Sequence, residues 1–266
     1  MSSFEEKNRL IYETAYKYLE DMTPEGIDLK KYFLGDSRNY ESLRDIYIQI
    51  IQSAQNYQRM PNVIAFNKRK EQIGKILYDF DYSQIQSLSV DDLYQRFRKE
   101  FNVTSTDSKR NSWYKWSCSV VDAAKFMSDF SNVEDFETFV ERFDYNVSTR
   151  MALPLLISTK ISGVGFALAC DLLKELGFTN YPKPDVHLIE VFSGVGLSEE
   201  KPDLVFEAIT RMADICDVTP YKVDKVFWLI CSGRFYLEKP QEIKVQARKK
   251  DLIDCLNEKC KSLENK

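Results

Sequence analysis

The stretch LPLLISTKISGVGFALACDLLKELGFTNYPKPDVHLIEVFSG, residues 153–194, is the most informative part of this chain of 266 residues. Apolar residues recur at helical spacing on both sides of two closely spaced glycines, Gly163 and Gly165. We therefore predict a helix that ends near Ser158, a tight turn through the glycines, and a second helix that runs to Leu176.

The turn Ile161-Ser162-Gly163-Val164-Gly165 can present backbone N–H groups beside the start of the second helix. Such a nest of amides at a helix N-terminus suits one phosphate group. The alternative is a plain connection between two helices that needs its glycines only for backbone geometry.

The second helix is followed by the segment YPKPD, residues 181–185, and then by the apolar run VHLIEVF, residues 186–192. Two prolines make this joint rigid. Asp185 stands where the N-cap of the next helix is expected, because an aspartate side chain accepts hydrogen bonds from the first helical amides.

Apolar residues follow helical spacing along nearly the whole chain, and 9 glycines and 8 prolines are too few for the many tight turns of a sheet-rich fold. Ser89 and Thr219 are further expected N-caps. We predict an all-α fold with no strand hairpin. The expected helices cover about 4–21, 40–57, 62–79, 89–100, 110–131, 133–143, 148–158, 165–176, 186–193, 202–215, 220–232 and 246–262.

Composition narrows the function classes. A net charge of −4 argues against a long basic surface for nucleic acid, although basic residues gather locally in residues 239–250. No apolar run is long enough to cross a membrane, and the first residues are polar. The six cysteines form no CxxC pair, so we expect thiols that pack as small hydrophobic side chains, with no metal site. A cytoplasmic protein, or a nuclear one in a eukaryote, is expected.

Taken in order, the Gly-Val-Gly turn, the helix, the proline-containing loop and the Asp-Val-His that starts at Asp185 resemble the helix-hairpin-helix Gly/Pro-Asp superfamily of DNA glycosylases. The interval from Gly165 to Asp185 is 185 − 165 = 20 residues, close to that of the family. A second match is IIQSAQ, residues 50–55, which resembles the family's apolar helix that ends in Ser-Ala-Gln. The resemblance covers roughly residues 45–65 and 145–235.

The resemblance implies a two-lobed helix-hairpin-helix DNA glycosylase fold with Asp185 as the catalytic carboxylate and the turn at residues 161–165 as the DNA-phosphate site. Such a carboxylate stabilises an oxocarbenium-like sugar and orients a water molecule. Asp185 can also serve as an N-cap alone, and the two roles are compatible.

Members of the superfamily that also cut the strand carry a lysine two residues after the second hairpin glycine, where it forms a Schiff base. This chain has Ala167 there, and it lacks the cysteines of the iron–sulfur branch. The expected activity is therefore excision that leaves an abasic site. No cofactor is expected, and a monovalent cation at the hairpin is left open.

The resemblance also suggests residues that contact an extruded nucleotide, each with a structural alternative. In the loop after residue 54, the expected DNA-probing residues are Gln55, Asn56, Tyr57 and Arg59, which could equally be ordinary surface residues. The expected base-pocket aromatics are Phe166, Trp113, Trp116, Tyr181 and Trp228. Aromatic residues on apolar helices are more often core.

We predict two lobes: a central bundle of residues 41–184, which includes the hairpin element at about 150–177, and a second bundle of residues 1–40 with 185–266. The expected partner is double-stranded DNA that contains a damaged or modified base, bound by a monomer. Two other functions are considered, a catalytically inactive DNA-binding module and a helical protein-interaction domain. The identity of the base, and a role in repair or in defence against modified DNA, are not fixed by the sequence.

Overall fold

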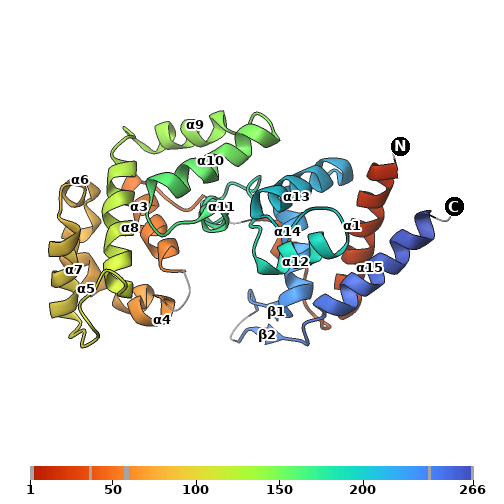
Figure 1. Ribbon diagram of the computed structural model, residues 1–266, viewed down its shortest axis with the longest axis horizontal. Coiled ribbons are helices and arrows are strands. Elements are labelled where there is room, and N and C mark those ends of the chain that lie inside the picture. The colour runs from red at the N-terminus through yellow and green to blue at the C-terminus, as the bar shows by residue number, and fades with distance from the viewer. Residues whose placement is uncertain (1–2, 36–37, 57–59, 239–240, 265–266) are drawn as a thin grey trace. The chain divides into compact units, whose positions relative to one another are not determined.

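The computed structural model describes residues 3–35, 38–56, 60–238 and 241–264. Nearly all of its regular structure is helical, which confirms the predicted all-α class (Figure 1). The elements are α1 (Ser3–Met22), α2 (Lys30–Phe33), α3 (Leu43–Ala54), α4 (Met60–Ile64), α5 (Phe66–Ile76), η1 (Tyr78–Phe80), α6 (Tyr82–Ile85), α7 (Val90–Glu100), α8 (Ser112–Met127), α9 (Val133–Arg142), α10 (Val147–Lys160), α11 (Phe166–Glu175), α12 (Val186–Gly194), α13 (Pro202–Cys216), α14 (Pro220–Ser232), β1 (Arg234–Phe235), β2 (Ile243–Lys244) and α15 (Lys249–Glu264).

Polar side chains begin the helices where the sequence predicts them. The Ser89 side chain accepts a hydrogen bond from the amide of Asp92 at the start of α7, and Thr219 accepts one from Lys222 at the start of α14. Each cap satisfies an amide that has no partner within its helix. The N-caps are therefore confirmed at both positions.

The chain divides into two compact units, residues 1–37 with 173–266 and residues 38–172. The predicted bundles divide at residues 40/41 and 184/185. The segment 173–184 belongs with α14, because the amide of Tyr221 donates to the Thr179 carbonyl (3.0 Å) and the Lys174 ammonium donates to Asp224 (3.0 Å). These contacts move the division into α11.

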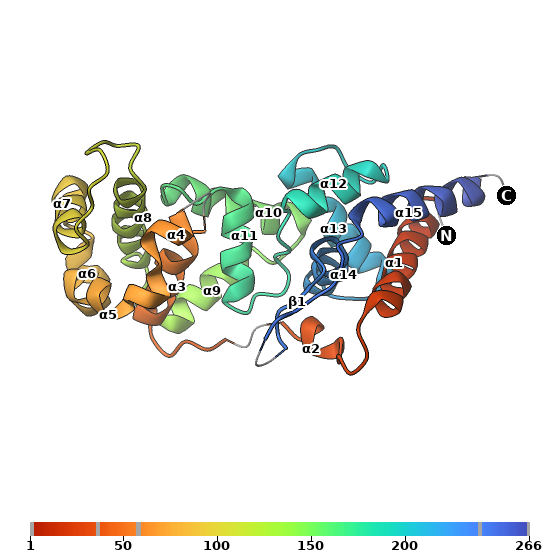
Figure 2. The ribbon, with the colours of Figure 1, turned by 90° about the horizontal axis from the view of Figure 1, so that it is seen from below.

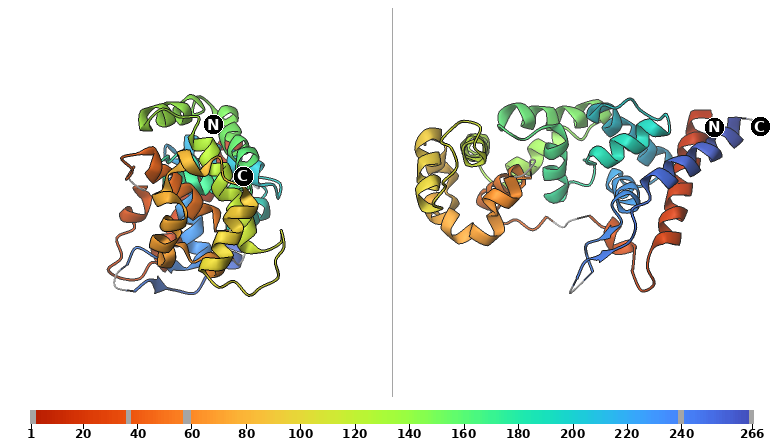
Figure 3. Two further views of the ribbon diagram at one scale, coloured as in Figure 1. Left: turned by 90° about the vertical axis from the view of Figure 1, so that its left-hand side faces the viewer. Right: turned by 60° about the horizontal axis from the view of Figure 1, so that its bottom comes forward.

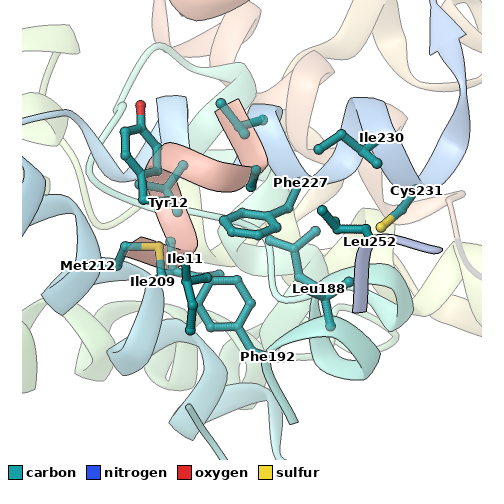
Figure 4. Close-up of a cluster of buried hydrophobic side chains, with 14 of the residues drawn as sticks. Ile11, Tyr12, Leu188, Phe192, Ile209, Met212, Phe227, Ile230, Cys231 and Leu252 are labelled. Atoms are coloured by element: carbon teal, nitrogen blue, oxygen red, sulfur yellow. The ribbon is translucent and has the colours of Figure 1, made fainter. Parts of the chain in front are cut away.

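The first unit has a core made by α1, α12, α13, α14 and α15 (Figure 4). Leu188 and Phe192 of α12 face Phe227 of α14, and the Phe192 and Phe227 rings meet edge to face with centroids 5.1 Å apart. Helices α1 and α15, the first and last of the described helices, lie side by side in this unit (Figure 2). Each fully buried apolar side chain of this kind contributes about 1.5–3 kcal/mol.

The second unit has a core rich in aromatic rings. Trp113 and Trp116 of α8 lie against Phe97 of α7, with ring centroids 5.2 Å apart in both pairs. Phe101 stacks on Trp113 at 4.8 Å, and the Arg69 guanidinium lies over the Phe101 ring at 4.9 Å. The buried aromatic surface and these ring contacts together stabilise the position of α8 at the centre of this unit.

Two predictions about regular structure are wrong. The helix expected over 62–79 is broken at Ala65, whose φ is +50°, and again over Tyr78–Phe80, where three consecutive residues have positive φ. The predicted absence of a strand hairpin also fails, because Arg234 pairs with Lys244 and Phe235 with Ile243 in an antiparallel ribbon (Figure 3, right).

Candidate functional site

The predicted turn between two helices is present between α10 and α11. The amide of Ile161 donates to the Ile157 carbonyl (2.9 Å) at the end of α10, and the amide of Val164 donates to the Ile161 carbonyl (3.1 Å). Gly163 has a φ of +81°, a conformation that favours glycine. Ile161 and Val164 are buried, so their side chains anchor the turn and leave the residues between and after them exposed.

Side chains of α8 fasten this turn in place. The Ser119 hydroxyl donates to the Ser162 carbonyl (2.6 Å), and the Ser162 amide donates to an Asp122 carboxylate oxygen (3.2 Å). A Cβ on Gly163 would lie 3.1 Å from the Ser119 oxygen, so α8 and the turn approach closely. Sequence reasoning did not identify Ser119 or Asp122, although both hold the predicted site in shape.

Two amides of the turn remain open. The amides of Ile161, Ser162 and Val164 are used within the protein, so these three predicted residues have no backbone donor left for a ligand. Among the described residues, no acceptor is bound to the amides of Gly163 and Gly165. A Cβ on Gly165 would meet nothing within 4 Å, so open space surrounds it. An anion can therefore approach both glycine amides.

Asp185 caps α12 as predicted. One of its carboxylate oxygens, Oδ1, accepts hydrogen bonds from the amides of His187 (2.9 Å) and Leu188 (3.2 Å). Asp185 is half-buried, and its other oxygen, Oδ2, has no hydrogen-bond partner among the described residues. The cap fixes the carboxylate while one oxygen stays open to a substrate or a water molecule.

The loop that leads to Asp185 is tied to a buried ion pair. Asp224 of α14 accepts from the Lys174 ammonium (3.0 Å) and from the Lys183 amide (2.8 Å), and both charged side chains are less than a tenth exposed. Losing one partner of such a pair costs about 3–5 kcal/mol. Asp224 therefore holds the end of α11, the proline loop and α14 together, and acts as a positioning residue for Asp185.

Ionisable groups gather near Asp185 around the buried thiol of Cys231. Burial raises the pKa of Cys231 to about 12, while nearby Lys249 lowers it and Asp185 and Glu190 raise it. Lys249 forms an ion pair with Glu190. The buried Cys231 thiol is therefore protonated at physiological pH and adds no charge beside Asp185.

Asp185 and the hairpin belong to different units, the first and the second respectively. Ala167, at the position that the lyase lysine takes in the superfamily, is half-buried in the first turn of α11. The nearby Lys174 is buried in its ion pair with Asp224. His187, two residues after Asp185, has a buried Nδ1 with no hydrogen-bond partner among the described residues.

The residues predicted to probe DNA do not share one environment. Gln55 is 7% exposed, and its side-chain oxygen accepts from the Phe66 amide (3.1 Å), so in this structure it points inward and caps α5. A role of Gln55 in probing DNA stays a prediction. Asn56 is exposed at the end of α3. Tyr57 and Arg59 lie outside the described residues.

The predicted pocket aromatics divide in the same way. Trp113 and Trp116 are almost fully buried, and the Trp116 indole donates to the Ile51 carbonyl (2.8 Å), so both are core residues in this structure, which is the structural alternative given for them. Tyr181 is also buried in this structure. Phe166 and Trp228 are half-buried and remain accessible to a ligand.

The described ranges contain no cluster of three or more His, Cys, Asp and Glu side chains that could hold a metal ion. None of their helices is long and apolar enough to cross a membrane.

No protein-family model matches the sequence, and no curated protein matches it. Among solved structures, the chain is similar to the 8-oxoguanine glycosylase/lyase of Methanocaldococcus jannaschii, determined in complex with a 15mer DNA that contains 8-oxoguanine. The TM-score is 0.49 at 14% sequence identity, and the match covers 80% of this chain and 95% of that chain. A likeness at this level does not establish a family, so the function has to be inferred from the site residues.

Proposed function

We propose that this protein is a DNA glycosylase that hydrolyses the N-glycosidic bond of a damaged or modified base and leaves an abasic site. The observation that carries the proposal is the hydrogen bonding of the two Asp185 carboxylate oxygens. Two backbone amides fix Oδ1, and Oδ2 has no described hydrogen-bond partner. The rigid loop that leads to this carboxylate is itself held by buried Asp224.

A fixed carboxylate suits this reaction. When the bond between the base nitrogen and C1′ of the sugar breaks, positive charge develops on the sugar ring, and the Asp185 carboxylate stabilises it. The same carboxylate orients a water molecule, whose hydroxyl adds to C1′ while its proton is passed on to the departing base. The products are the released base and an abasic deoxyribose.

The hairpin supplies binding without reading sequence. In the proposed complex, the open amides of Gly163 and Gly165 donate to one backbone phosphate beside the N-terminus of α11. Contacts to phosphate position a protein on DNA but carry no sequence information. Selectivity for the base then depends on the side chains that the base can reach, and Phe166 and Trp228 each keep a half-buried ring within their own unit.

The residues favour excision without strand cleavage. A lyase reaction needs an amine that attacks C1′ as a nucleophile. Ala167 has no amine at the hairpin position, and the Lys174 ammonium is held by buried Asp224. The proposed protein is therefore monofunctional.

The test is a panel of end-labelled duplexes, each with one oxidised purine, alkylated purine, deaminated base or bulky modified pyrimidine. After incubation with the full chain, half of each sample receives hot alkali, which cleaves at abasic sites. Product that appears only after alkali supports the proposal and identifies the base. Product without alkali contradicts monofunctional excision and assigns a lysine nucleophile elsewhere in the chain.

A second candidate, a DNA-binding module without activity, is favoured by one observation, the net charge of −4. A negative net charge weakens the long-range attraction to the phosphate backbone, which disfavours an enzyme that must search long DNA. Salt-dependent binding to duplex DNA, with no base released from any substrate, would select this function over the glycosylase.

A further inference from the structure

A pocket of about 320 Å³ opens in the second unit directly beside the hairpin. Helix α8 forms one wall, the hairpin another, and the start of α4 and the loop before α8 complete it. Its lining includes Met60, Lys109, Tyr114, Lys115, Cys118 and Gly163. The volume is much larger than one phosphate needs, so the pocket has room for more of a ligand than the group bound at the glycine amides.

The rim of the pocket carries two exposed ammonium groups, those of Lys109 and Lys115. The Lys109 ammonium lies 6.0 Å from the ring centroid of Tyr114, and both residues line the pocket. Two carboxylates lie near the pocket: Asp122, which accepts from the Ser162 amide and lies 3.9 Å from Lys125, and Asp91, whose charge acts on Cys118. Neither lines the pocket, whereas Lys109 and Lys115 do, so the rim favours anions.

The wall of the pocket is uncharged. Met60 is buried, and the half-buried Tyr114 ring packs edge to face on Tyr94 with centroids 5.3 Å apart. Burial raises the pKa of the Cys118 thiol, so it stays protonated and adds no charge. A cationic rim above an apolar wall suits a ligand that is anionic at its edge and apolar in its body.

The pocket has few groups with which to read a base edge. The Ser119 hydroxyl already donates to the Ser162 carbonyl, and the Ser162 amide is bound to Asp122. Reading a base requires several placed donors and acceptors. A deoxyribose ring needs none, because it packs through its apolar face and is linked to phosphate on both sides.

We propose that this pocket binds the sugar–phosphate backbone of the DNA strand next to the phosphate held at the hairpin. Lys109 and Lys115 bind the flanking phosphates, and the deoxyribose between them lies against Tyr114 and Met60. This inference rests on the proposed function, because the hairpin must first hold DNA. The pocket therefore extends the hairpin site along one strand without adding preference for a sequence.

The test measures the affinity of the full chain for a labelled duplex with a stable abasic analogue as a function of KCl, by fluorescence anisotropy. Each phosphate bound by a lysine contributes about 0.9 to the slope of log affinity against log salt. We expect Lys109→Gln and Lys115→Gln each to reduce that slope by about 0.9, and the double variant by about 1.8. Between about 50 and about 200 mM KCl, the double variant should then lose about tenfold less affinity than the wild type.

The matched control is Lys75→Gln in α5, an exposed lysine of the same unit that pairs with Glu71 and lies outside the pocket. Its slope should equal that of the wild type. A double variant with the wild-type slope would overturn the inference while leaving the hairpin site intact. A wild-type chain that binds no DNA at any salt concentration would overturn the proposed function and this inference together.

The sugar position has its own test in Cys118→Phe, which fills the pocket but changes no charge. We expect this variant to bind the same duplex at least tenfold more weakly at every salt concentration, with an unchanged slope. Circular dichroism checks that the helices remain. A folded Cys118→Phe protein with wild-type affinity would show that the pocket receives no part of the strand.

Discussion

The two hairpin glycines are expected to respond in opposite ways to alanine. Gly163 has a φ of +81°, where an L-residue costs about 1–2 kcal/mol, and its new Cβ would lie 3.1 Å from the Ser119 oxygen. Gly163→Ala should therefore lower the free energy of unfolding by about 1–2 kcal/mol. For a chain of this size, that corresponds to a Tm lower by about 2–8 °C.

Gly165 is different because its φ lies outside the left-handed region and its Cβ would meet nothing within 4 Å. Gly165→Ala should leave stability unchanged or raise it by about 0.4–1 kcal/mol, since alanine restricts the unfolded chain. The added methyl group would, however, occupy the space through which a phosphate reaches the amide. Losing a hydrogen bond to a charged group costs about 1.5–3 kcal/mol, which is roughly a tenfold to hundredfold loss of DNA affinity.

Thermal unfolding followed by circular dichroism measures the Tm of each variant, and fluorescence anisotropy with a duplex at fixed salt measures its DNA affinity. Gly26→Ala is the control for backbone strain, because Gly26 has a φ of +87° with nothing within 4 Å and lies in the other unit. It should lower Tm and leave DNA affinity alone. A Gly165→Ala protein that is as stable as the wild type and binds DNA equally well would refute the hairpin as a phosphate site.

Three further predictions follow from buried groups. Asp224→Asn removes one carboxylate that pairs with the buried Lys174 ammonium, so urea denaturation should show a loss of about 3–5 kcal/mol in the free energy of unfolding. Trp116→Phe removes the donor to the Ile51 carbonyl and should cost about 1–3 kcal/mol with an unchanged rate of base release, since Trp116 is core. Burial raises the pKa of Cys231 from 9.0 to about 12, so the thiol loses its proton at a lower pH in the unfolded chain than in the folded one. The free energy of unfolding should therefore fall as pH rises above about 9. At pH 8, iodoacetamide should label Cys231 only in denaturant, which mass spectrometry can check.

The regular structure was predictable where caps and periodicity agree, as at Ser89 and Thr219. It was not predictable at Ala65 and Tyr78–Phe80, because these positive φ values fall on residues that give no glycine or proline signal. The strand ribbon of Arg234–Phe235 was missed for another reason. Two residues are too few to show an alternating pattern.

For the site, local sequence predicted the hairpin turn and the cap at Asp185, because both depend on residues within a few positions of each other. The residues that fix them in space are distant in sequence: Ser119 and Asp122 hold the turn, and Asp224 holds the loop. One signal was readable, since Asp224 is a lone acidic residue on the apolar face of α14. A buried charge there requires a partner.

The inward direction of Gln55, Trp113 and Trp116 was not predictable, because a motif fixes position along the chain but not the direction of a side chain. Gln55 turns inward to cap α5, and the two tryptophans of α8 face the core. Helical spacing is the same for an aromatic residue in a core and for one in a pocket. Only the packing of α3, α5 and α7 on α8 separates the two.

The most direct test of the proposed function is single-turnover base release by Asp185→Asn, measured on the duplex from which the wild type releases a base. Asparagine is as good an N-cap as aspartate, so stability and DNA affinity should remain at wild-type values. Removing the charge should slow base release by about 100-fold to 10,000-fold. Release at the wild-type rate by a folded Asp185→Asn protein would contradict the assignment of Asp185 as the catalytic carboxylate.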